Sequence, residues 1–123
     1  LVLFCYLTGN ADMHLKNFSL IENAQQEFEF SPAYDLINTH IVMPEDKEES
    51  ALTINGKKSK LNRNDFQILA TSLKISDKAL LSIYKRFEAI LPTWISCVKQ
   101  SFLSKQTQGE YIEMLITRNQ KFF

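Results

Sequence analysis

The sequence predicts a mainly α-helical fold with small β-hairpins. Apolar side chains recur at helical spacing through residues 62–119, nearly half of the chain. Two pairs of short β-favouring runs lie before this region, and each pair flanks polar or turn-forming residues. With 123 residues, of which 45% are apolar and 23% charged, the chain has the size and composition of one globular domain or a large piece of one.

Charge, hydropathy and cysteine content exclude several classes of protein. Fourteen basic and fourteen acidic side chains cancel, which argues against direct nucleic-acid binding through bulk positive charge. No run approaches the ~20 apolar residues of a membrane span, and residues 1–7 lack the basic leader and cleavage site of a signal peptide. Cys5 and Cys97 lie far apart, without the companions of a zinc site or a disulfide framework. The sequence therefore predicts a protein of the reducing cytoplasm.

The first elements predicted along the chain are a helix and a hairpin. Residues 1–7 are apolar nearly all round, as in a buried helix, and Gly9 is well placed to end it. The chain begins with Leu inside this helix, so we expect it to be the C-terminal portion of a longer protein. Residues 18–21 and 28–30 favour β-structure around a polar segment and predict a hairpin. Pro32 ends the second strand because proline cannot donate a ladder hydrogen bond.

The middle of the chain predicts a loop and a second hairpin. Residues 45–49 are mostly acidic and are expected to form a solvated loop. Asn55 and Gly56 supply the two positive-φ residues of a type I′ turn between residues 52–54 and 57–61. The charged side chains that follow form a basic cluster of Lys57, Lys58, Lys60 and Arg63. This cluster either protects an exposed strand edge or binds an acidic surface, and the sequence leaves both open.

The remainder of the chain predicts helices. Residues 62–65 carry start signals for a first amphipathic helix, and Ser76 is placed to cap a second. Pro92 is expected to kink or end the second helix, with residues 94–102 continuing on a further helical segment. A capping box at residues 107–110 is expected to begin the last helix.

The strongest functional signal follows Gly9. Five polar side chains fall within eight positions between an apolar run and a β-like run: Asn10, Asp12, His14, Lys16 and Asn17. Polar residues here would also suit an ordinary turn, but such a density of ionisable groups is costly unless it binds something. Asp12 and Asn17 lie five apart, which is the spacing of a kinase catalytic loop, where the Asp receives the substrate hydroxyl proton and the Asn holds magnesium.

A second acid completes the predicted site. The hairpin between residues 18 and 30 should bring Asp35 beside Asn17, so that Asp35 supplies a further hard oxygen ligand. One carboxylate and one amide carbonyl suffice, because magnesium keeps water and phosphate oxygens for the rest of its octahedron. His14 is expected to position the catalytic groups, and Lys16 could reach a phosphate as a point charge. The set predicts phosphoryl transfer with ATP and magnesium as cofactors.

The same residues carry a resemblance. The strings NADMHLKNFSLI at residues 10–21 and PAYDL at residues 32–36 resemble the catalytic loop and metal-binding segment of the HipA-type toxins, serine/threonine kinases of bacterial toxin-antitoxin systems. The resemblance implies that Asp12 is the catalytic base and that Asn17 and Asp35 hold magnesium. It also implies the helical C-terminal lobe of a protein-kinase-like fold, which the rest of the chain resembles more loosely.

The resemblance also implies partners. HipA-type kinases act on a protein substrate, an aminoacyl-tRNA synthetase, and are held by a DNA-binding antitoxin of the HipB kind. No Gly-rich phosphate loop and no Val-Ala-Ile-Lys-like lysine occurs in the sequence, and we expect both in an N-terminal lobe upstream of Leu1. Residues 1–123 would then be a C-terminal lobe that is inactive alone. Two alternatives stay open: a small-molecule phosphotransferase of the aminoglycoside-kinase kind, and a non-catalytic helical module that binds an antitoxin.

Overall fold

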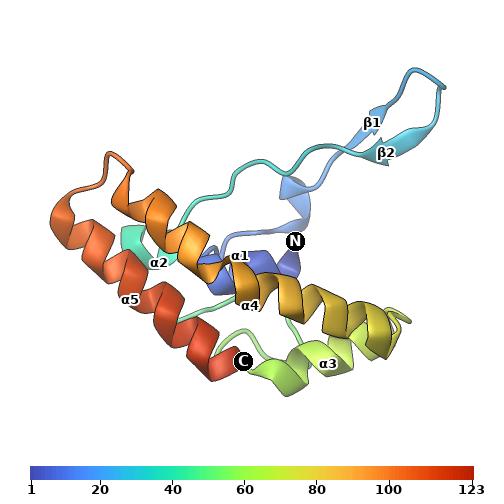
Figure 1. Ribbon diagram of the computed structural model, residues 1–123. Coiled ribbons are helices and arrows are strands. Elements are labelled where there is room, and N and C mark those ends of the chain that lie inside the picture. Colours follow the sequence, from blue (N-terminus) through green and yellow to red (C-terminus); the bar gives the residue numbers. More distant parts are fainter.

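The computed structural model describes all 123 residues and confirms a mainly α-helical fold with a small hairpin (Figure 1). The elements in order are α1 (Val2–Thr8), a 3-10 helix (Leu15–Asn17), β1 (Leu20–Glu22), β2 (Phe28–Phe30), α2 (Thr39–Val42), α3 (Arg63–Ser72), α4 (Asp77–Lys99) and α5 (Lys105–Phe122). No helix is both long enough and apolar enough to cross a membrane. The hairpin projects away from the helical body, whereas α4 and α5 run side by side along it.

The core forms around α1, which contacts α5 directly. Tyr6 and Leu7 of α1 are each 1% exposed, so this short helix is held by burial rather than by its own length. Each fully buried large apolar side chain contributes roughly 1.5–3 kcal/mol. The buried apolar residues of the main core are Leu3, Tyr6, Leu7, Ile54, Leu61, Phe66, Ala70, Leu80, Tyr84 and Phe122.

Helix α1 ends at Gly9, as the sequence predicts. The Asn10 N–H donates to the carbonyl of Cys5 and the Gly9 N–H donates to that of Tyr6, the two bonds of a Schellman cap. Gly9 has φ +83°, a left-handed conformation that glycine adopts at no steric cost. This cap turns the chain from the core into the polar loop that follows.

We expect Gly9→Ala to destabilise the fold by at least ~1–2 kcal/mol, the cost of the left-handed conformation for an L side chain. The added Cβ would also lie 2.7 Å from Asn38 Oδ1 and 2.8 Å from Met114 Sδ. Gly109→Ala is the matched control, because Gly109 lies in α5 and its Cβ would meet nothing within 4 Å. Urea unfolding of the two variants checks this, and a Gly9→Ala midpoint equal to that of the wild type would contradict it.

Two helix predictions are wrong. Pro92 does not end the helix: it lies inside α4, which continues to Lys99 as one helix, so residues 94–99 belong to α4 and not to a separate segment. Leu91 and Trp94, on either side of the proline, pack against the cluster that joins α4 to α5, and this burial offsets the lost hydrogen bond. Phe102 lies beyond α4 and is fully exposed, so it extends no apolar stripe.

The last helix begins earlier than predicted. Ser104 is the N-cap of α5, and its Oγ accepts a hydrogen bond from the Thr107 N–H at 3.1 Å. The expected capping box at residues 107–110 is therefore wrong, and these residues lie within the first turns of the helix. Both Ser104 and Thr107 are capping residue types, so local sequence does not discriminate between them.

The segment between α2 and α3 keeps only part of its predicted form. Asn55 and Gly56 have φ +51° and +72°, as the type I′ turn requires, but one bridge between Ile54 and Lys57 replaces the expected strands. The acidic loop is not wholly solvated, because the Glu49 side chain is 19% exposed and accepts the Leu61 N–H at 2.7 Å. No strand edge therefore exists here for the basic cluster to protect.

Three members of the basic cluster bind within the chain. Lys57 pairs with Asp65 at 2.9 Å and Lys58 pairs with Glu48 at 3.0 Å. The Arg63 guanidinium lies 4.8 Å from the centre of the Tyr84 ring. The first pair ties the middle loop to α3, the second lies within the loop, and the Arg63 contact joins α3 to α4, so these three residues have structural contacts.

The capping box of α3 predicts acid sensitivity. Burial raises the pKa of Asp65, but hydrogen bonds from Asn55, Lys57 and the Asn62 N–H outweigh it and leave this pKa below its ordinary value of 3.8. A lowered folded-state pKa adds stability above the unfolded pKa, and this stability is lost as the pH falls through the folded value. We expect Asp65→Asn to be less stable than wild type at pH 7, with the gap narrowing below about pH 4. Urea midpoints from pH 7 to 3 check this, and a constant gap would contradict it.

Candidate active site

The loop after α1 carries the first predicted site residues. Asp12 and His14 lie just before the 3-10 helix, and His14 Nε2 is 3.0 Å from Asp12 Oδ1. Their side chains are 50% and 55% exposed, respectively. The Asp12 carboxylate is therefore held on one side by His14 and open to a substrate on another.

Asn17 and Asp35 meet as the sequence predicts. The Asn17 Nδ2 group donates to Asp35 Oδ2 at 2.9 Å and to the Asp12 carbonyl at 3.0 Å. Because a backbone carbonyl can only accept, this second bond fixes which way the amide is turned, and Asn17 Oδ1 is left without a hydrogen-bond partner. One carboxamide thus links all three residues that the kinase interpretation requires.

The β1–β2 hairpin explains this meeting. Leu20 pairs with Phe30 and Glu22 with Phe28 in antiparallel register, and the Ser31 N–H donates to the Ser19 carbonyl at 2.9 Å. The chain therefore leaves the loop at Asn17 and returns beside it at Asp35, 18 positions later. The hairpin was predicted, although β1 begins two residues later than expected, at Leu20.

Two buried residues that the sequence did not single out as site residues hold the loop in shape. Asn10, 2% exposed, donates through Nδ2 to the Asp35 carbonyl at 3.1 Å and accepts the Asp12 N–H at 2.9 Å. Thr39, 4% exposed at the start of α2, donates to the Gly9 carbonyl at 3.1 Å and accepts the Ala11 N–H at 2.8 Å. The position of Asn10 within the polar string was a signal for it, whereas nothing local marks Thr39.

Lys16 joins the site differently from the other residues. Its backbone carbonyl accepts a hydrogen bond from the Tyr34 hydroxyl at 3.0 Å, and its side chain is exposed without an ion pair in the structure. The structure thus gathers Asp12, His14, Asn17 and Asp35 into one hydrogen-bonded group. The Lys16 ammonium remains outside that group.

The sequence matches a known protein family over most of its length. The family model of the HipA-like C-terminal domain matches residues 1–94. This chain belongs to that family. The match runs from α1 to the middle of α4 and includes every residue of the candidate site. It confirms the HipA-like resemblance found in residues 10–21 and 32–36.

A relative supports the same assignment. The HipA-like chain is 35% identical over 95 residues to a protein named putative kinase Y4dM from Sinorhizobium fredii. The alignment covers 72% of this chain but only 23% of the relative, so the matched region is less than a quarter of that protein. Family and relative together support a kinase-like function in general terms.

The oxygen donors of the HipA-like site suit magnesium. No group of three or more His, Cys, Asp or Glu side chains is arranged to hold a metal ion. Asn17 Oδ1 and the Asp35 carboxylate are hard oxygen donors, and Mg²⁺ commonly takes only one or two protein ligands beside water and phosphate. These two residues are the ones that could hold it.

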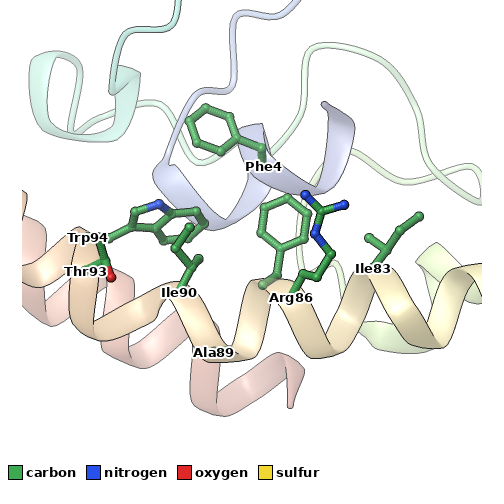
Figure 2. A pocket seen from close by; sticks show the side chains of 8 residues that line it. Phe4, Ile83, Arg86, Ala89, Ile90, Thr93 and Trp94 are labelled. Atoms are coloured by element: carbon green, nitrogen blue, oxygen red, sulfur yellow. The ribbon is translucent and has the colours of Figure 1, made fainter.

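Of two pockets in the structure, one adjoins the site. A pocket of about 290 Å³ at the base of the hairpin is lined by Asn17, Ser19 and Phe30 together with residues 31–33. A larger pocket of about 620 Å³ lies between α1 and α4, where the ring centroids of Phe4 and Trp94 are 5.7 Å apart (Figure 2). None of the candidate site residues lines the larger pocket, so the smaller one belongs to the site.

Proposed function

We propose that this chain is the C-terminal catalytic lobe of an ATP-dependent serine/threonine protein kinase, the toxin component of a bacterial toxin-antitoxin system. The observation that carries this proposal is the Asn17 carboxamide, which bonds to both the Asp12 backbone and the Asp35 carboxylate. This arrangement gives one exposed carboxylate for proton transfer and a separate pair of oxygen donors for a metal. Membership of the HipA-like family supports it.

Asp12 would act as the general base. Its half-exposed carboxylate accepts the proton of a Ser or Thr hydroxyl as the hydroxyl oxygen bonds to the γ-phosphorus of ATP and ADP leaves. His14 holds Asp12 Oδ1 and so orients the carboxylate. The Asn10 side chain accepts the Asp12 N–H and so fixes the Asp12 backbone.

Asn17 and Asp35 would hold Mg²⁺ together with ATP. When bound, magnesium neutralises charge on the β- and γ-phosphate oxygens. Asn10 and Asn17 hold Asp35 at its carbonyl and its carboxylate respectively, so the two proposed ligands are held next to each other before the metal binds. The exposed Lys16 is available to a phosphate oxygen as a point charge.

The rest of the proposal concerns the longer protein. We place the phosphate-covering lobe outside these 123 residues, since no Gly-x-Gly-x-x-Gly can be formed from Gly9, Gly56 and Gly109. The matched region is also only 23% of the length of the S. fredii relative. From the family, we propose a protein substrate such as an aminoacyl-tRNA synthetase and a HipB-like antitoxin as partners.

The test is phosphoryl transfer by the longer protein that contains this chain. We expect incorporation of the γ-phosphate of ATP into Ser or Thr of a protein acceptor, with magnesium present and not with a chelator. A parallel panel of small alcohols and aminoglycosides separates the small-molecule phosphotransferase. Absence of transfer to every acceptor, with antitoxin binding intact, would favour the non-catalytic module instead.

A further inference from the structure

Tyr34 makes contacts that the proposed chemistry does not use. Its hydroxyl lies 3.0 Å from the Lys16 carbonyl and 2.7 Å from Ser19 Oγ. The carbonyl can only accept, so the phenol proton goes to Lys16 and the Ser19 hydroxyl donates to the phenol oxygen. Tyr34, the residue before Asp35, is therefore hydrogen-bonded to Lys16, the residue before Asn17, and to Ser19, the residue before strand β1.

These bonds matter because they act on a side of Asp35 that its own hydrogen bonds do not hold. Residues 31–38 form no helix or strand, and Asp35 has φ +55°, a conformation that side chains other than glycine seldom adopt. Its carbonyl is held by Asn10 and its carboxylate by Asn17. Among these contacts, only the two hydrogen bonds of Tyr34 hold the chain on the N-terminal side of Asp35.

The hydroxyl, rather than the ring, supplies this restraint. Tyr34 is 41% exposed and belongs to neither core cluster, so burial does not fix its position. Its two hydrogen bonds span 15 and 18 positions of sequence. The bond to Lys16 parallels the bond between Asn17 and Asp35, which lies one residue further along each segment.

We propose that Tyr34 is a positioning residue that sets the separation of Asn17 and Asp35 through its hydroxyl. The expected effect on magnesium binding rests on the proposed function, whereas the expected effect on the separation of Asn17 and Asp35 does not. Tyr34→Phe removes both bonds and keeps the ring. Tyr84→Phe is the matched control, because the buried Tyr84 hydroxyl has no hydrogen-bond partner and lies on α4.

The first measurement is nuclear magnetic resonance of this chain without nucleotide. The Asn17 Nδ2 protons report directly on the bonds to Asp12 and Asp35. In Tyr34→Phe we expect these protons to shift and to exchange faster with water, and in Tyr84→Phe we expect no change. Ser19→Ala, which keeps the bond to Lys16, should give a smaller effect. Unchanged Asn17 side-chain protons in Tyr34→Phe would overturn the proposal.

The second measurement uses the longer protein. Tyr34→Phe should raise the magnesium concentration needed for half-maximal nucleotide binding by roughly tenfold, the order expected for one or two exposed hydrogen bonds. A purely structural role would lower the melting temperature without moving this magnesium midpoint. If the wild type binds nucleotide without any magnesium dependence, the proposed function fails. In that case the positioning role of Tyr34 is tested by the Asn17 Nδ2 protons alone: a change in Tyr34→Phe supports it, and no change contradicts it.

Discussion

Asp12→Asn is expected to lower phosphoryl transfer by the longer protein by at least ~100-fold, the contribution of a positioned general base. The amide keeps the size of the side chain but cannot take a proton from the substrate hydroxyl. The melting temperature should change little, because the Asp12 side chain is half-exposed and its backbone bonds to Asn10 and Asn17 remain. Initial rates with saturating ATP, and thermal unfolding of the same samples, measure both quantities.

The control for this variant is Glu22→Gln, which removes one negative charge from the exposed hairpin near the site. It should leave the rate unchanged, so that any loss in Asp12→Asn is not a general effect of net charge. Near-normal turnover by Asp12→Asn would remove Asp12 from the mechanism. The kinase-like family membership would stand in either case.

The residues of the candidate site were predictable because their signals are local in sequence. Asp12 and Asn17 are five residues apart, and the hairpin that returns the chain to Asp35 is encoded by two short apolar runs and the polar turn between them. Gly9 is also a local signal, since a helix end needs a left-handed residue. Residue spacing and turn-forming residues act locally, so the structure they predict does not depend on how the rest of the chain packs.

The supporting residues depend on distant contacts and were not predictable in the same way. Thr39 reaches Gly9 across 30 positions, and Asn10 reaches Asp35 across 25. Either residue reads locally as an ordinary turn or cap. Tertiary burial also kept α4 continuous through Pro92, against its local signal.

Glu49 shows the same limit for electrostatics. Its position within an acidic run predicts a solvated side chain. In the structure its carboxylate accepts the Leu61 N–H and interacts electrostatically with the buried Arg118 guanidinium. Burial lowers the pKa of Arg118, and the charge of Glu49 opposes that shift. Arg118 in turn donates to the Tyr6 carbonyl of α1. A charge from the middle of the chain thus helps to hold the helix that precedes the candidate site.

In the longer protein, Asp35→Ala is expected to abolish magnesium-dependent nucleotide binding, or to make it require a far higher magnesium concentration. The reason is that the variant removes the one carboxylate among the proposed ligands. Alanine also disfavours the φ of +55° at this position, so lost binding alone could reflect a displaced loop. Asp35→Asn separates the two causes, since asparagine tolerates the left-handed conformation and loses only the charge. Nucleotide affinity titrated against magnesium should weaken in both variants, and Asn17→Ala should change it in the same direction. Curves identical to the wild type for Asp35→Asn and Asp35→Ala would show that the metal is held elsewhere, and the exposed acids of the hairpin, Glu22, Glu27 and Glu29, would be the next to test.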